Sequence, residues 1–358
     1  MKEKASPLFS QYILDGQQMD QTPFSALFDC LDGNGTVDVP AGPFPDIIDE
    51  YLDKAPQSFE YREEDAEKYL SAILRTPFRR KSVDLDYPAL WTISAIDNLL
   101  LETMFREGHF TLQDLLLMAK WDWNNTPAGN MAAFWESTVA AGSFLFDLGV
   151  KLDRYFVEEN RRECTLDLSV RNRLPSRRIC PDTMESNPGD WLIYIPFATG
   201  RRHLGGSALS QVIGHGAGAE TDLSDADYFI DCYEVVRELL EDGIITAGCV
   251  VGRGGLLTAA EKFRGRKGFT MDIGGVMAST GEDDSLRILF AEIPGVIIEI
   301  RGEDYDYIDS QFLLQEIMYF PIGHPDASMH GVGISKSGKN SLGNILASLM
   351  SQASEGED

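Results

Sequence analysis

The chain has 358 residues, 43% of them hydrophobic, and its 57 Asp and Glu outnumber its 31 Lys and Arg to give a formal net charge of −26. This acidic balance excludes nucleic acid and an anionic membrane surface as expected partners, because both require a basic protein surface. The N-terminus has no signal-like apolar core, no apolar run reaches the roughly 20 residues that span a bilayer, and the 5 cysteines lack CxxC spacing. We therefore expect a cytoplasmic protein with reduced thiols and no metal site.

The first half of the chain predicts an arm followed by a domain of helices and strands. Residues 1–62 are rich in Pro, Gly and Asp, which is typical of irregular structure. Residues 63–185 follow, with a helical pattern over 62–75, a long apolar helix over 131–148 and a strand over 164–170. We expect this region to form an N-terminal domain with helices on one face of a sheet.

Two polar positions in this region have specific expected roles. Thr111 is followed three residues later by Asp114, which is the signature of a capped helix and predicts one beginning in TLQDLLLMA. Asp122 lies between two tryptophans in KWDWNN. It is either a carboxyl group with a perturbed pKa or, as we expect, a surface residue between core aromatics.

The second half predicts another domain over residues 186–335. A turn in NPGD introduces an apolar strand over 191–197. Further strands are expected over 244–251 and 287–300, with the helical pattern GLLTAAEKF between them. The alternation of strands and helices predicts an α/β (α+β) fold class with two domains, both of one type.

A helix and the C-terminus complete the predicted second half. Ser224 is expected to cap the helix DADYFIDCYEVVRELLED, which ends at Gly243. Residues 336–358 are expected to form a C-terminal helix and a disordered tail, because the last residues are polar and acidic.

Two glycine-rich segments are candidate anion-binding loops. In RRHLGGSALSQ, Gly205, Gly206 and Ser207 would present backbone N–H groups and a hydroxyl to a phosphate. In RGGLLTAAEKF, Gly254 and Gly255 would open a second helix in the same way. The alternative for both is a tight strand-to-helix turn in which glycine only permits close packing, and this is the commoner use of such segments.

Four motifs, in this order along the chain, match those of one known family. They are the turn at Gly189-Asp190 before a strand, LGGSALSQ against "LGGSALAQ", CVVGRGGL against "HDRSDGGL", and LFAEIPGVIIEI against "LFNEELGAVIQV". On these motifs the chain, over roughly residues 65–325, resembles the family of aminoimidazole ribonucleotide synthetase and formylglycinamidine ribonucleotide synthetase. These are ATP-using enzymes of purine synthesis, and the likeness is to the second, C-terminal synthetase half of the latter.

The chain departs from the family where the family's chemistry lies. Cys249 stands in the place of the motif's His, and Val250 in the place of its Asp. The family's "GKDS" run falls on YFVE at 155–158, and the Asn of its "SANW" run falls on Asp122. Because a Val side chain cannot ligate a metal and a Cys is a poor proton carrier near neutral pH, we expect no metal ligand here and assign no catalytic residue.

The resemblance implies a phosphoribosylformylglycinamidine synthase-like protein of purine biosynthesis, and the departures imply a divergent, non-catalytic synthetase half. Such a half would pair with an active half or with a second copy of itself. It would hold ATP or ADP, with Mg2+, as a structural nucleotide on the two glycine loops (Gly205, Gly206, Ser207, Gly254 and Gly255). The alternative is an active ATP-dependent carbon–nitrogen ligase that acts on a ribonucleotide amide.

Overall fold

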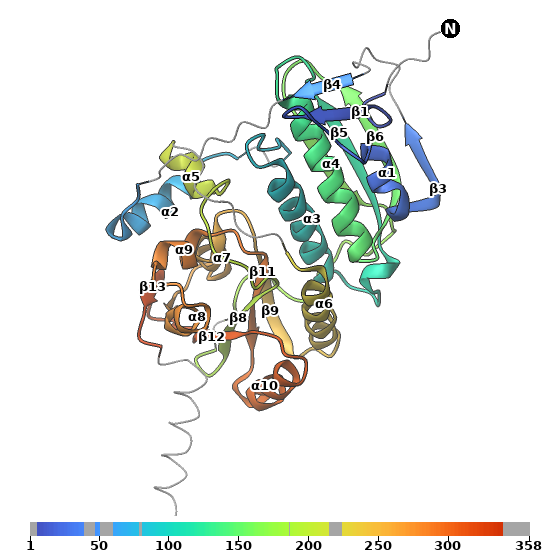
Figure 1. Cartoon of the computed structure of the whole chain (residues 1–358). Coiled ribbons are helices and arrows are strands. Elements are labelled where there is room, and N and C mark those ends of the chain that lie inside the picture. Colours follow the sequence, from blue (N-terminus) through green and yellow to red (C-terminus); the bar gives the residue numbers. More distant parts are fainter. Residues whose placement is uncertain are drawn as a thin grey trace, which may run out of the picture.

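A computed structural model describes residues 6–38, 47–50, 60–78, 81–185, 187–214 and 224–338 (Figure 1). These residues form an α/β fold built on two four-stranded sheets, one from each half of the chain. The strands predicted over 164–170 and 191–197 both exist, and they lie in different sheets. The helix and tail expected over 336–358 lie, from residue 339 onward, outside the described residues.

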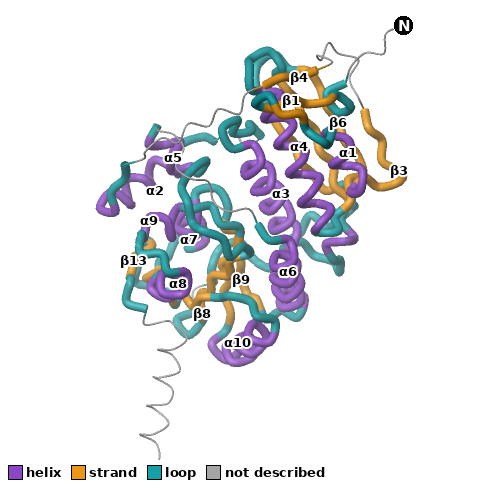
Figure 2. Tube along the Cα trace, in the orientation of Figure 1, coloured by secondary structure: helices purple, strands orange, loops and turns teal. Residues whose placement is uncertain are grey.

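The first sheet has the strand order β3-β6-β5-β7, in which β6 is parallel to both β3 and β5 and β7 is antiparallel to β5. Its strands are β3 (Leu31–Asp38), β6 (Lys151–Glu159), β5 (Leu116–Trp123) and β7 (Thr165–Val170). One face is covered by α4 (Asn130–Asp147), which runs beside α3 (Pro88–Met104) (Figure 2). The long apolar helix predicted over 131–148 is therefore confirmed as a buried element.

Strand β5 corrects the prediction made from Thr111. The capping box between Thr111 and Asp114 is present, but it closes only a 3-10 turn, Leu112–Asp114, and the chain then enters β5. Residues 116–123 alternate between buried and partly exposed, as a strand does when one face meets a core. The burial of this face outweighs the local cap signal.

The two tryptophans of β5 face the core, and Asp122 between them faces outward. Trp121 donates its indole N–H to the hydroxyl of Ser137 on α4 at 3.0 Å, and Trp123 is also fully buried. Asp122 is partly exposed and forms an ion pair with Lys120 at 3.2 Å. The prediction of a surface carboxylate between core aromatics is confirmed.

The N-terminal segment is more regular than the arm expected over residues 1–62. It contributes α1 (Pro23–Leu27), the edge strand β3 of the first sheet, and a small sheet of β1 (Gln11–Leu14), β2 (Gln17–Gln18) and β4 (Ile47–Glu50). Helix α1 packs so closely on α4 that a side chain on Gly142 would collide with the backbone of Ala26. Burial of apolar side chains such as that of Tyr12 stabilises regular structure in this segment, which its Pro and Gly content did not predict.

The second sheet has the order β12-β8-β11-β9, and all its pairs are antiparallel. Its strands are β12 (Phe320–Gly323), β8 (Trp191–Pro196), β11 (Gly295–Ile300) and β9 (Ile245–Val251). Strand β8 is buried along almost its whole length because helices cover both faces of the sheet. They are α6 (Ala226–Glu241) and α10 (Tyr305–Leu314) on one face, and α7 (Gly255–Phe263) and α9 (Ser285–Phe290) on the other.

The strand predicted over 287–300 is wrong in its first part. Residues 285–290 form α9, and β11 begins only at Gly295. Asp284 caps α9 by accepting a hydrogen bond from the N–H of Leu286 at 2.9 Å. An apolar run fits a buried helix as well as a buried strand, so periodicity did not separate them.

The remaining described elements surround the second sheet. They are α2 (Ala66–Arg75), α5 (Ala208–Ile213), α8 (Gly274–Thr280) and the parallel pair β10 (Phe269–Asp272) and β13 (Val332–Ser335). The helix predicted over 62–75 corresponds to α2 and the 3-10 turn before it. Asp225, and not Ser224, caps α6, since its carboxylate accepts from the N–H groups of residues 227 and 228.

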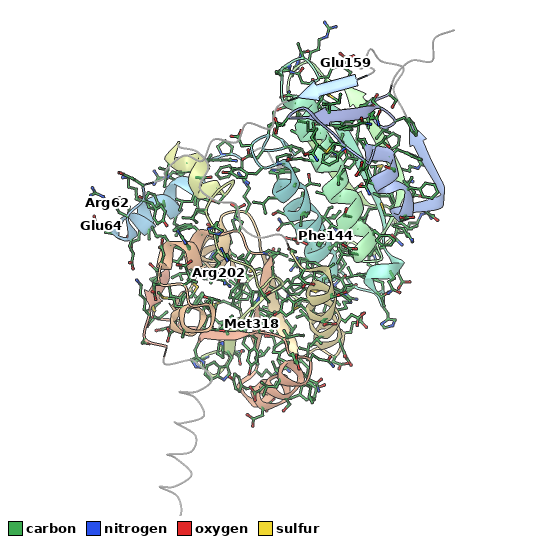
Figure 3. All side chains as sticks on the ribbon, in the orientation of Figure 1. Arg62, Glu64, Phe144, Glu159, Arg202 and Met318 are labelled. Carbon is green, nitrogen blue, oxygen red and sulfur yellow. The ribbon has the colours of Figure 1, made fainter. Side chains whose placement is uncertain are left out.

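Helix α6 joins the two halves of the molecule into one core. Phe144 of α4, labelled in Figure 3, meets Phe229 of α6 edge to face, with 6.2 Å between ring centroids. Phe229 in turn contacts Phe197, with 5.2 Å between ring centroids. The first sheet and one face of the second thus share a continuous apolar cluster. Among the described helices, none combines the length and apolarity needed to cross a membrane.

Candidate functional site

A cleft of about 1450 Å3 lies between the two halves. Its first wall comes from residues within 73–102 and 166–182, which include much of α3. Its second wall comes from residues within 203–211 and 249–262, together with Glu292. The site is therefore assembled from segments that are far apart in the sequence.

The structure brings the two predicted glycine loops to the second wall. Gly205, Gly206 and Ser207 line the cleft directly. Gly254 and Gly255 follow the cleft-lining Arg253 and begin α7, but they are not among the cleft-lining residues of the described chain.

The first loop is a turn into α5 that only glycine fits well. Gly206 has a φ of +72°, and a Cβ there would lie 3.2 Å from the ring of Tyr87 on the first wall. Ser207 caps α5, since its hydroxyl oxygen accepts a hydrogen bond from the N–H of Ser210 at 3.2 Å and donates to the carbonyl of Leu204 at 2.7 Å. The hydroxyl expected to meet a phosphate is used within the loop.

The second loop is packed even more tightly. Gly254 and Gly255 have φ of +91° and +72°. A Cβ on Gly255 would lie 2.7 Å from the carbonyl oxygen of Leu289 and from the Cα of Phe290, at the end of α9. Glycine is required here because the start of α7 touches backbone.

Glu292 links the two loops, and sequence reasoning missed it. Its Oε1 accepts hydrogen bonds from the N–H of Ala208 at 2.6 Å and from the N–H of Gly254 at 2.8 Å. Its Oε2 lies 3.6 Å from the guanidinium of Arg253. The signal available in the sequence was a single carboxylate in the apolar run LFAEIPGVII, which aligns with a Glu of the family motif.

A chain of polar contacts, which we call the strap, continues from Glu292 across the cleft. Arg253 donates to the side-chain oxygen of Gln211 at 2.6 Å, and Gln211 donates to Asp84 of the first wall at 3.2 Å. The Arg253 guanidinium also lies 4.7 Å from the ring centroid of Phe78. Burial raises the pKa of the Asp84 carboxyl.

The positions that correspond to the family's His and Asp face the cleft as apolar or neutral groups. Cys249 and Val250 both line it. Burial raises the pKa of the Cys249 thiol to about 12, so the thiol stays protonated at neutral pH. In the described part of the chain, no group of three or more His, Cys, Asp or Glu side chains is arranged to hold a metal ion. Cys249 and Val250 therefore offer no ligand to a bound Mg2+.

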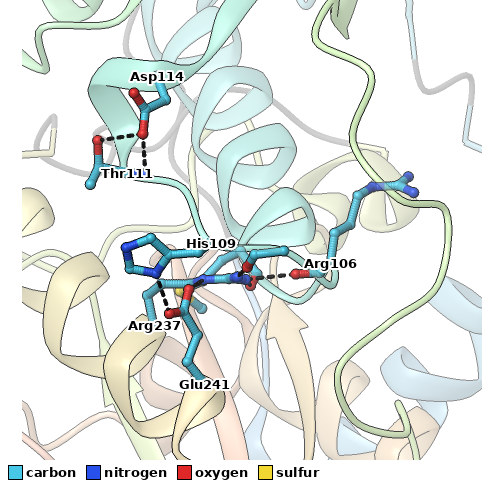
Figure 4. Close-up of polar contacts among 8 residues, drawn as sticks. Arg106, His109, Thr111, Asp114, Arg237 and Glu241 are labelled. Carbon is cyan, nitrogen blue, oxygen red and sulfur yellow. Dashed lines mark hydrogen bonds and ion pairs between the residues drawn. The ribbon is translucent and has the colours of Figure 1, made fainter.

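Helix α3 of the first wall is fixed at its C-terminal end by a buried arginine of α6. Arg237 donates to the backbone carbonyls of Met104, Arg106 and Gly108, and it forms an ion pair with Glu241 at 2.6 Å (Figure 4). The guanidinium thus satisfies carbonyl groups that a helix end leaves without partners.

Helix α3 also carries a buried carboxyl that sequence reasoning missed. Asp97 is only 1% exposed, and burial raises the pKa of its carboxyl to about 8. The hydroxyl of Ser224 donates to one of its oxygens at 2.9 Å, whereas the other oxygen has no partner among the described residues. Ser224 therefore serves Asp97 and not the helix that it was expected to cap.

The family model for AIR synthase related proteins, C-terminal domain, matches residues 187–307. The second half of the chain therefore contains a domain of the AIR synthase-related type. The match contains the whole second wall and none of the first. The resemblance inferred from the motifs is confirmed at this level.

Known proteins that resemble this chain give the same relationship. The chain is 26% identical over 211 residues to a probable phosphoribosylformylglycinamidine synthase, chloroplastic/mitochondrial, of Arabidopsis thaliana. The aligned region covers 55% of this chain and 15% of the plant protein. It also matches the structure of Thermotoga maritima PurL complexed with FGAR, at a TM-score of 0.52 and 13% identity, over 73% of this chain and 46% of that one. The complex of the same protein with ATP gives 0.50 and 12%, over 76% and 47%. The likeness to PurL concerns the fold, and the chain spans well under half of the length of the plant relative.

Proposed function

We propose that this AIR synthase-related chain is a non-catalytic, phosphoribosylformylglycinamidine synthase-like half whose cleft binds a nucleotide. The observation that carries the proposal is the pair at positions 249 and 250. A neutral thiol and an apolar side chain stand in the cleft at the places where the family motif has His and Asp. Neither can carry a proton or ligate a metal near neutral pH, so this wall lacks the groups that a ligase step requires.

The nucleotide is ATP or ADP, and it binds without Mg2+. The fold is shared with Thermotoga maritima PurL, which has been seen with ATP. Tyr87 and Trp91 on the first wall offer aromatic surface to a base, and Arg253 and Lys262 on the second wall offer charge to phosphates. Because Cys249 and Val250 offer no ligand to Mg2+, we expect Arg253 and Lys262 to neutralise the charge of the phosphates.

Nucleotide content and binding test the proposal. We expect the purified chain to release a nucleotide on denaturation, read by absorbance at 260 nm and chromatography. Calorimetry should show that the chain binds ATP or ADP with an affinity that EDTA does not change. An assay with ATP, a ribonucleotide amide and ammonia should show no turnover by the chain. Binding that is lost with EDTA, or no binding to the wild-type chain, contradicts the proposal.

The alternative is an active ATP-dependent carbon–nitrogen ligase, and one observation favours it. Asp84 lines the cleft and burial raises the pKa of its carboxyl, which is the property of a general acid–base group. If turnover is found, Asp84→Asn should abolish it while leaving ATP binding in place. Turnover that survives Asp84→Asn removes this residue as the proton carrier.

We extend the proposal to assembly, with a second copy or a synthetase-like chain as the partner. The outward face of the first sheet carries Lys120, which pairs with Asp122 at 3.2 Å and with Glu158 at 2.9 Å, and all three remain partly exposed. A partner on this face would have to match these charges. Sedimentation at micromolar concentration should give a mass above that of a single chain, from a second copy or from a bound partner. A monomer with no co-purifying partner would contradict this proposal of assembly.

A further inference from the structure

Glu292 occupies a position that is built for an anion. Its carboxylate is 16% exposed and faces two backbone N–H donors, from Ala208 and Gly254, and the guanidinium of Arg253. One of these donors precedes the nine-residue helix α7, whose N-terminal end adds a partial positive charge. A side-chain carboxylate thus takes the place that a phosphate oxygen takes in many helix-terminus sites.

Thr258 supplies a second, independent sign that a ligand belongs here. Its side chain is 1% exposed, it lines the cleft, and its hydroxyl has no hydrogen-bond partner among the described residues. The hydroxyl also lies beside the start of α7, because a Cβ on Gly254 would be 2.6 Å from it. Leaving a buried hydroxyl without a partner is costly, and a ligand oxygen at this point would remove the cost.

We propose that Glu292 is an internal occupant of an oxyanion subsite, and that the phosphate of a cleft ligand displaces its carboxylate. The subsite consists of the N–H of Gly254, the guanidinium of Arg253 and the hydroxyl of Thr258, with the N–H of Ala208 at its edge. This inference rests on the proposed function, because it assigns the phosphate of the nucleotide to this end of the cleft.

The need to displace Glu292 lowers the affinity of the cleft for a phosphate-bearing ligand. A ligand that must first expel an internal anion binds with an affinity reduced by the fraction of molecules in which the subsite is open. When phosphate displaces the Glu292 carboxylate, Arg253 can turn to the phosphate and leave Gln211. The strap, which connects Arg253 through Gln211 to Asp84, is then broken. Binding at the second wall therefore changes the contact with the first.

Removal of the carboxylate tests the inference with inorganic phosphate as the probe. Glu292→Ala should lose thermal stability in chloride, since two N–H donors lose their acceptor, and should regain it in phosphate at equal ionic strength. Its affinity for phosphate should exceed that of the wild type by about tenfold or more. Glu292→Gln, which keeps an acceptor oxygen, should fold as the wild type does. Its affinity for phosphate should rise by less than that of Glu292→Ala.

The matched control is Glu261→Ala. Glu261 lies on α7, as Thr258 does, pairs with Arg264 and is outside the cleft lining of the described chain, so its loss should produce no phosphate dependence. Thr258→Val should reduce the increase in phosphate affinity that Glu292→Ala produces, because valine removes the hydroxyl and keeps the shape of the threonine side chain.

The outcomes separate this inference from the proposed function. If both Glu292 variants bind phosphate no better than the wild type, Glu292 is a structural link and the inference is wrong, even where the wild type binds nucleotide. If phosphate rescues Glu292→Ala but no form of the chain binds ATP or ADP, the subsite stands and the nucleotide proposal fails.

Discussion

The two walls of the cleft are built in opposite ways. The second wall is made of backbone turns, in which Gly206 and Gly255 have positive φ and a side chain on Gly255 would collide with backbone. Two of its backbone N–H groups donate to Glu292. The first wall is made of side chains on α3 and on the segment before it, such as Phe78 and Trp91. The family model matches only the half that contains the second wall.

The difference explains where this chain kept the family's sequence and where it did not. A wall that depends on φ above zero and on backbone contacts accepts few residues, so its motif is constrained by architecture whatever chemistry the cleft performs. A wall made of side chains can be rebuilt one residue at a time. The surviving glycine motifs therefore mark architecture, and function has to be argued from the groups around them.

The largest expected effect comes from a side chain added to the second wall. Gly255→Ala should lower the free energy of unfolding by roughly 3 kcal/mol or more, since it adds a left-handed φ penalty to a collision with backbone. Gly243→Ala is the matched control, with a φ of +69° and nothing within 4 Å, and should cost about 1 kcal/mol. Chemical denaturation measures both, and equal losses would show that the close approach is unimportant.

A smaller effect, dependent on pH, should come from the first wall. Because the pKa of Asp97 is raised to about 8 when folded, the native state keeps a proton that the unfolded chain has lost, and stability falls as pH rises from about 4 to about 8. Asp97→Asn removes this loss. The variant should be more stable than the wild type by a few kcal/mol at pH 8.5 and by much less at pH 4.5.

Urea titrations at the two pH values measure the difference between Asp97→Asn and the wild type. Other titrating groups affect both proteins alike and cancel. A difference that is the same at both pH values would mean that Asp97 ionises normally in the folded protein.

The smallest effect is expected at the position of the family's His. Since burial raises the pKa of the Cys249 thiol to about 12, its alkylation at pH 8 should be at least about a hundredfold slower than that of a free thiol. Cys249→Ala should leave nucleotide affinity within about twofold. Fast modification of Cys249, found by mass spectrometry of the alkylated peptide, would show that its thiol is reactive after all.

The sequence predicted elements whose signals are local and left out those that depend on tertiary contact. The buried helix at 131–148, the strand at 191–197 and both glycine loops are indicated by apolar runs and turn residues. The cap at Thr111 was also correct, but the helix after it gave way to β5, because burial on α4 decided the outcome. Local signals identify a turn more reliably than they identify the element after it.

The candidate site was predicted in part, for the same reason. Gly205, Gly206 and Ser207, which the sequence analysis proposed as an anion-binding loop, line the cleft, and their binding of an anion stays a prediction. Glu292 lies more than 80 positions from Ala208, and no local pattern reveals that the two meet. Asp97 and Ser224, which are 127 positions apart, form a hydrogen bond that only the packing of α3 beside the second half creates.

The anchoring of α3 by Arg237 has a mechanical result. The helix has 17 residues, a length of about 25 Å, and Arg237 holds its far end while the strap meets the chain just before its near end. A rotation of one half against the other would pivot at Arg237 and act with the full lever arm on the contact between Gln211 and Asp84. In such a rotation, the contact between Gln211 and Asp84 would undergo the largest displacement, because it lies at the end of α3 farthest from Arg237.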